Sequence, residues 1–193
     1  MNDNHFLNID YLSRGTQTQV QVYGILKRLR LMDLLKEYNP ILVGTVPLDL
    51  DVPGSDLDII CEVREFDPFE RLITRSFGKE EEFLFTRRRV QGIERIKANF
   101  NYKGWPIEIF GQAIATIEQN GFKHMVIEAR LIELFGIRFK DTVRKLKAEG
   151  IKTEPAFAQV LRLEGDPYEK LLEIYDWSDE ELRRLWADST GVV

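Results

Sequence analysis

The chain has 193 residues, the length of one domain or of one compact domain with a smaller appendage. Its net charge of −5 argues against broad, non-specific binding to nucleic acid, which needs a basic surface, but is compatible with a locally basic pocket for one anionic ligand. Cys61 is the only cysteine, so no disulfide can form within the chain. We expect a cytoplasmic protein, because the N-terminus lacks a signal-peptide pattern and no segment approaches the roughly 18 apolar residues of a membrane span.

The first part of the chain predicts a helix followed by strands and loops. Apolar residues at helical spacing indicate one long amphipathic helix that ends at Asn39-Pro40. We expect Asp67 to cap a short helix that has Pro68 at its first position. In chain order we expect a helix over 16–38, a strand over 40–46, a loop over 47–54, a strand over 56–63, a short helix over 67–76, and strands over 83–90, 93–102 and 105–110.

After Gly111 the pattern becomes helical, with glycines between the segments. Candidate helices run over about 113–120, 122–135, 138–149, 154–163, 167–176 and 178–187. Strands in the first part and helices in the second are typical of an α+β fold. We therefore expect a mixed-sheet α/β core over residues 1–112 and a helical region over 113–193 packed on it.

Two aspartates at the start of the second strand are the most informative feature. Side chains of a strand alternate between faces, so Asp56 and Asp58 are expected on one face, with Cα atoms roughly 6.6 Å apart. Paired carboxylates together with substrate phosphates are the ligands that Mg²⁺ prefers. The pair therefore predicts a metal site for a phosphate chain. A second Asp-x-Asp, Asp49 with Asp51, lies in the Pro-containing loop, where we expect mobile, solvated carboxylates.

The segment Val43-Gly44-Thr45, followed by a loop and Ser55-Asp56-Leu57-Asp58, resembles the signature of the nucleotidyltransferase superfamily, the minimal fold shared with DNA polymerase beta. The specific match covers about 20 residues, and the order of elements extends it over the first 110 or so. The chain also looks like an uncharacterised bacterial family within that superfamily. The resemblance implies an α+β fold with a mixed nucleotidyltransferase-like sheet and a C-terminal helical region.

The resemblance also implies roles for individual residues. Asp56 and Asp58 would hold Mg²⁺ or Mn²⁺, and Gly44 and Thr45 would cradle the phosphates of an NTP such as ATP. The superfamily has a third carboxylate on a later strand, and Glu108 is the acid at that place in this sequence. Aspartate is more usual there, so Glu108 would be either a third metal ligand or a base. The alternative is that all three acids are exposed charges at a sheet edge.

Basic side chains on the third and fourth strands are weaker candidates. Arg87 and Arg89 would share one face and Arg88 the other, while Arg95 and Lys97 share a face of the next strand. Arg87, Arg89 and Lys97 are candidates for binding the nucleotide, as a basic rim for triphosphate or an anionic acceptor. Ordinary solvated strand charges are the alternative. Ser55 would either contact a phosphate or stabilise the turn.

His124 and Glu128 lie four residues apart on the helix expected over 122–135, beside Lys123. In this superfamily helices after the sheet often contact nucleotide or acceptor, so the three could line the cleft. The simpler alternative is a hydrogen bond between His124 and Glu128. Two histidines and one cysteine make a zinc site improbable.

The leading hypothesis is therefore a Mg²⁺-dependent nucleotidyltransferase that moves a nucleoside monophosphate from an NTP to a hydroxyl group. The acceptor would be a small molecule or a protein side chain, with a long nucleic acid least favoured by the net charge. A second hypothesis is a nucleotide-binding module that has lost transfer activity, such as a regulatory or toxin–antitoxin component. A third is metal-assisted phosphoester hydrolysis by the same carboxylates. The base, the acceptor and the oligomeric state stay open.

Overall fold

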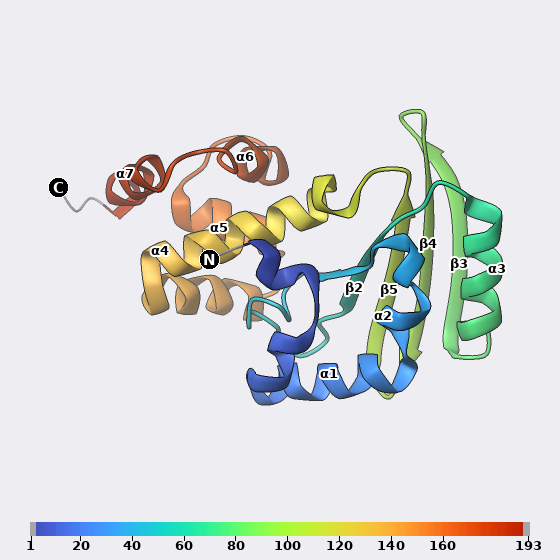
Figure 1. The fold of residues 1–193 in the computed structure, drawn as a ribbon. Coiled ribbons are helices and arrows are strands. Elements are labelled where there is room, and N and C mark those ends of the chain that lie inside the picture. The colour runs from blue at the N-terminus through green and yellow to red at the C-terminus, as the bar shows by residue number, and fades with distance from the viewer. Residues whose placement is uncertain (1–2, 191–193) are drawn as a thin grey trace.

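A computed structural model describes residues 3–190 of the chain, with a sheet and its covering helices on one side and a group of C-terminal helices on the other (Figure 1). The strands are β1 Ile41–Val43, β2 Leu57–Glu62, β3 Glu81–Val90, β4 Ile93–Tyr102 and β5 Trp105–Gln112. The α-helices are α1 Gln17–Leu29, α2 Leu31–Leu34, α3 Phe66–Phe77, α4 Asn120–Ala148, α5 Thr153–Leu161, α6 Pro167–Glu173 and α7 Asp179–Thr190. Short 3-10 helices are η1 Asp3–Leu7, η2 Asp10–Arg14, η3 Lys36–Tyr38 and η4 Thr116–Glu118.

The five strands form one mixed sheet in the order β1-β2-β5-β4-β3. β2 and β5 are parallel, and every other neighbouring pair is antiparallel. In the parallel pair Asp58 of β2 lies beside Glu108 of β5. Sheet and C-terminal helices are largely segregated along the chain, which confirms the predicted α+β fold with a mixed sheet.

One face of the sheet packs against α1 and α3. Leu57, Ile59 and Cys61 of β2 point to this face and are buried in a cluster with Phe69 of α3 and Leu26 of α1. Because side chains alternate along a strand, the residues between them, Asp58 and Ile60, point the other way. Cys61 is fully buried, and burial raises the pKa of its thiol.

The other face of the sheet meets the C-terminal helices through a second apolar cluster. Val43 of β1 and Ile60 of β2 pack in it with Phe139 of α4 and Phe157 of α5. Residues of the sheet and residues of the C-terminal helices therefore share this second cluster, although they are far apart in sequence.

The loop between β1 and β2 is also fastened to α4. The Asp49 carboxylate forms ion pairs of 2.8 Å with Lys140 and 2.9 Å with Arg144. Asp49 is thus anchored rather than mobile and solvated, so the expectation for this Asp-x-Asp was wrong at Asp49. The sequence could not show that α4, some 90 residues later, supplies two cations at this point.

Several helix boundaries differ from the prediction. The helix expected over 16–38 is interrupted at Arg30, whose φ of 51° is left-handed, so α1 ends there and α2 begins anew. α3 begins at Phe66 after Glu65, and no side chain caps it. Asp67 lies inside the helix and pairs with Arg87 instead. Its side chain is therefore not the predicted cap.

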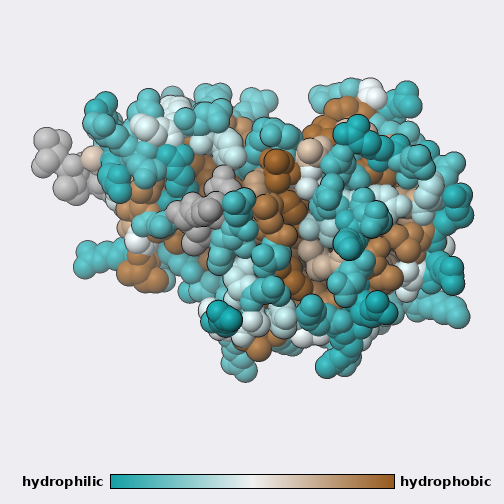
Figure 2. Space-filling model, in the orientation of Figure 1, coloured by the Kyte–Doolittle hydropathy of each residue, from teal (hydrophilic) through white to brown (hydrophobic). Residues whose placement is uncertain are grey.

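The region expected to hold two helices, 122–135 and 138–149, is α4 with a kink. Gly136 has φ 77° and ψ −167°, which breaks the helical path and explains the predicted gap. In the segment expected as a helix over 113–120, the structure has only η4 before α4 begins at Asn120. Of the helices in residues 3–190, none has the combined length and apolarity to cross a membrane. Figure 2 shows a mostly hydrophilic face with hydrophobic residues gathered near the middle of the view.

Candidate active site between the sheet and the C-terminal helices

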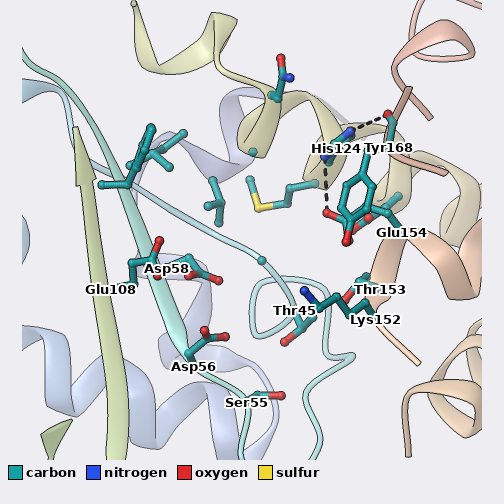
Figure 3. A pocket seen from close by; sticks show the side chains of 18 of the residues that line it. Thr45, Ser55, Asp56, Asp58, Glu108, His124, Lys152, Thr153, Glu154 and Tyr168 are labelled. Carbon is teal, nitrogen blue, oxygen red and sulfur yellow. Dashed lines mark hydrogen bonds and ion pairs between the residues drawn. The ribbon is translucent and has the colours of Figure 1, made fainter. Parts of the chain in front are cut away.

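A pocket of about 1220 Å³ lies between the open face of the sheet and the helices α4 and α5 (Figure 3). On the sheet side it is lined by the β1–β2 loop and by residues of β2 and β5, and on the helix side by residues from Glu118 to Tyr168. The sequence-predicted residues that line it are Gly44, Thr45, Ser55, Asp56, Asp58, Arg95, Glu108, His124 and Glu128.

Asp56 and Asp58 both face this pocket (Figure 3). Asp56 is exposed and stands just before β2, which begins one residue later than the predicted strand, while Asp58 is partly buried within β2. Burial, followed by the charges of Asp56 and Glu108, raises the pKa of Asp58 to about 7. The fold therefore holds Asp58 where a bound cation would offset the negative charges around it.

Gly44 makes the closest backbone approach to this carboxylate. A Cβ atom at position 44 would lie 2.8 Å from Oδ2 of Asp58, and the φ of Gly44 is +85°, in the region that favours glycine. The loop that follows is held by Gln19 of α1, whose side-chain amide donates to the carbonyls of Val46 (2.9 Å) and Pro47 (3.2 Å). Only a glycine leaves room here for the carboxylate beside the backbone.

Glu108 stands next to Asp58 and has cationic and amide partners. Lys97 of β4 forms an ion pair with Oε2 of Glu108, and the amide of Asn99 donates to the same oxygen at 3.3 Å. Register places Asn99 directly across from Glu108. The structure thus brings the three predicted acids to one pocket wall, with Glu108 already partnered by Lys97.

The chemistry of the acids fits a hard divalent cation, since carboxylate oxygens are the ligands of choice for Mg²⁺ and Mn²⁺. Asp58 is half-buried among like charges, an arrangement that a cation would relieve. Among residues 3–190, no group of three His, Cys, Asp or Glu side chains is close enough together to hold a metal ion. Asp56 and Asp58 are therefore the fitting pair, and Glu108 would have to turn from Lys97 to join them.

The basic residues divide between the two faces of the sheet. Arg95 lines the pocket, and its Nε is buried without a hydrogen-bond partner among the described residues. Arg87 lies across from the buried Ile96 and pairs with Asp67 and Glu94 on the α3 side. Arg89 is 71% exposed there and lies 4.0 Å from Glu94.

This placement corrects two nucleotide-binding predictions. Arg87 and Arg89 point to the face opposite the pocket, because they alternate with Arg88, whose register partner is the pocket residue Arg95. Lys97 stays on the pocket side through its ion pair with Glu108. The sequence showed which arginines share a face but not which face carries the pocket.

Two small hydroxyl residues complete the sheet side. Oγ of Ser55 accepts a hydrogen bond from the backbone N–H of Val52 (2.9 Å), so this side chain stabilises the turn before Asp56. Thr45 lines the pocket, and its carbonyl accepts from the N–H groups of Leu48 and Leu50. Both hydroxyl groups keep a hydrogen to donate toward the pocket.

The helix side of the pocket carries a second polar group of residues. His124 contacts the Tyr168 carbonyl through Nε2 (3.0 Å) and the Glu154 carboxylate through Nδ1 (3.5 Å), as the dashed lines in Figure 3 show. The simpler prediction for His124, a hydrogen bond to Glu128, was therefore wrong, because α5 and α6 supply nearer partners. Lys123 pairs with Glu118 at 2.8 Å and is not among the pocket residues.

Sequence reasoning missed the residues that the segment from α4 to α6 adds late in the chain: Lys147, Lys152, Thr153, Glu154 and Tyr168. They follow no motif spacing with the aspartate pair. Only the packing of the C-terminal helices brings them opposite Asp58, so no local signal could have identified them.

Comparison with known structures supports the fold. Over 82% of this chain and 49% of the other, the structure resembles the Cid1 poly(U) polymerase with Mg and 3′-dATP bound, at 16% identity and a TM-score of 0.52. It also resembles a cytoplasmic RNA terminal U-transferase, at 14% identity over 82% of this chain and 48% of that one, with a TM-score of 0.51. Our chain spans about half the length of these two proteins.

A third similar structure is that of the GLD-2/RNP-8 complex, at 10% identity over 98% of this chain and 83% of the other, with a TM-score of 0.51. The fold is thus nucleotidyltransferase-like, as the Gly44 and Asp56–Asp58 pattern predicted. No curated protein matches the sequence. Residues 24–174 match a sequence family known only as a domain of unknown function, and the chain belongs to this family, DUF4269.

Proposed function

We propose that the protein is a nucleotidyltransferase that uses Mg²⁺ or Mn²⁺ to move a nucleoside monophosphate from an NTP to a hydroxyl group of a small molecule or protein. The observation that carries the proposal is the packing of Gly44 against the Asp58 carboxylate, beside Asp56, on the wall of a pocket large enough for a nucleotide and a small acceptor. The nucleotidyltransferase-like fold supports it.

Each residue of the sheet side has a role in this proposal. Asp56 and Asp58 would hold the metal, which when bound neutralises the phosphate chain and stabilises charge developing during transfer. The backbone at Gly44 and the Thr45 hydroxyl would contact the phosphates, and the guanidinium of Arg95 would bind phosphate oxygens from the sheet. We further propose that residues 1–112 form the nucleotide side and 113–193 the acceptor side of the pocket.

A second candidate function, a nucleotide-binding module without transfer activity, has one observation in its favour. Glu108 is paired with Lys97, and no three acidic or histidine groups of residues 3–190 are gathered around a metal position. A protein that binds nucleotide but does not transfer it could retain such an arrangement.

The test compares the wild type with Asp58→Asn. Isothermal titration with a non-hydrolysable ATP analogue, with and without Mg²⁺, measures binding, and pyrophosphate release across a panel of hydroxyl acceptors measures transfer. We expect Mg²⁺-dependent binding in the wild type and its loss in Asp58→Asn, because removing one carboxylate removes a metal ligand.

Asp33→Asn is the matched control, since Asp33 is an exposed aspartate of α2 away from the pocket. Unchanged Mg²⁺-dependent affinity in Asp58→Asn would refute the site. Binding without pyrophosphate release would favour the second candidate, and release of inorganic phosphate would indicate hydrolysis.

A further inference from the structure

Glu128 of α4 is one of the pocket acids that the proposed transfer does not use. Its side chain is 3% exposed and lines the helix side of the pocket. Its Oε1 is buried without a hydrogen-bond partner among residues 3–190. A buried carboxyl oxygen without a hydrogen-bond donor is costly, and an N–H group of a ligand would satisfy it.

The charged groups around Glu128 do not satisfy it. The charge of Lys147 lowers the pKa of Glu128, but its ammonium group donates to Oγ1 of Thr153 (2.7 Å) and no hydrogen bond from it reaches Oε1 of Glu128. Glu154 of α5 is a further like charge, and its own partner is His124. Burial, followed by the charge of Glu154, raises the pKa of Glu128 well above its ordinary value. Oε1 of Glu128 therefore receives no hydrogen bond from residues 3–190.

The pocket as a whole is short of positive charge. Six carboxylates line it against three lysine or arginine side chains. A metal at Asp56 and Asp58 would offset the sheet side only, because Glu128 and Glu154 come from helices on the other wall. A ligand that fits both walls would carry phosphate toward the metal and a nitrogen group toward Glu128.

We propose that Glu128, with Glu154 beside it, binds an amino or ammonium group of the molecule that occupies the helix side of the pocket. The inference rests on the proposed function and deepens it. The nitrogen group has two possible sources, an amine on the acceptor or the exocyclic amine of the nucleobase, and both present N–H donors to a carboxyl group.

Matched ligand pairs test this inference and distinguish the sources. For the acceptor we use glucosamine against glucose, and for the base CTP against UTP and ATP against purine riboside triphosphate, all with Mg²⁺. Dissociation constants come from two-dimensional NMR titrations of the full chain. We expect the amino member of one set to bind about tenfold more tightly, the ratio that one hydrogen bond to a buried acceptor provides.

Glu128→Leu should abolish that preference, since leucine has a similar bulk but no oxygen to accept a hydrogen bond from an N–H donor. Asp141→Asn, an exposed substitution on the same helix, should keep it. Equal affinities within all three pairs, or a preference that persists in Glu128→Leu, would overturn the inference. If Mg·ATP binds and depends on Asp58 but no amino preference exists, only this inference fails. If Mg·ATP does not bind, the proposed function fails as well.

Discussion

The carboxyl group of Asp58 gives the sharpest test of the site before any ligand is known. Its pKa is about 7 in the folded protein against 3.8 ordinarily, because of burial and the like charges of Asp56 and Glu108. Between these values the folded state holds a proton that the unfolded state has released. Linkage then requires that the free energy of unfolding falls as pH rises through this range.

The size of the effect follows from the slope of about 1.4 kcal/mol per pH unit. Between pH 5 and pH 8 the wild type should lose about 3 kcal/mol at this position, and somewhat less where pocket water screens the charges. Asp58→Asn has no proton to release, so it should lack this loss and be the more stable protein at pH 8 in the absence of metal.

Urea denaturation in EDTA at pH 5, 6, 7 and 8, for both proteins, measures the difference directly. Glu128, whose pKa is shifted by burial, Glu154 and Lys147 and not by Asp58, affects both proteins alike and cancels in the comparison. Parallel stability curves for the wild type and Asp58→Asn across this range would refute the reasoning. Added Mg²⁺ should restore stability to the wild type at pH 8 and not to the variant, since binding to the folded state stabilises it.

Two further substitutions test neighbouring features. Gly44→Ala should destabilise the fold by more than about 1 kcal/mol and weaken Mg·ATP binding. Gly54→Ala is the control: Gly54 also has a positive φ (+89°), but a Cβ atom there would have nothing within 4 Å, so this variant carries the backbone penalty alone. Equal thermal shifts in the two variants would contradict a role for the Asp58 contact. Arg95→Ala should weaken triphosphate binding about tenfold in a calorimetric titration. Arg87→Ala, on the opposite face of the sheet, should leave the affinity unchanged. A larger loss of affinity in Arg87→Ala than in Arg95→Ala would contradict the assignment of faces.

The sequence predicted the sheet side of the pocket well because that side is local. Gly44, Asp56 and Asp58 lie within fifteen residues, and strand alternation is enough to place both carboxylates on one face. The β4 boundaries agreed with the prediction because an alternating pattern and two turns delimit that strand.

The remaining features depend on contacts between distant segments. Whether Arg87 or Arg88 faces the pocket depends on which side of the sheet α3 covers, and alternation alone leaves that open. The partners of His124 come from α5 and α6, thirty and forty-four residues further along the chain. Local spacing, which suggested Glu128 as its partner, carries no information about such contacts.

The parallel pairing of β2 with β5 has a consequence for how the protein folds. β3, β4 and β5 follow one another as antiparallel neighbours with short turns, so we expect them to form early. Joining β2 to β5 closes a loop of about fifty residues, and α4 packs against β1 from still further away. During synthesis Asp56, Asp58 and Glu108 would then come together only after most of the chain has left the ribosome. By that stage the apolar clusters on both faces of the sheet can form, and their packing offsets the repulsion between the three carboxylates.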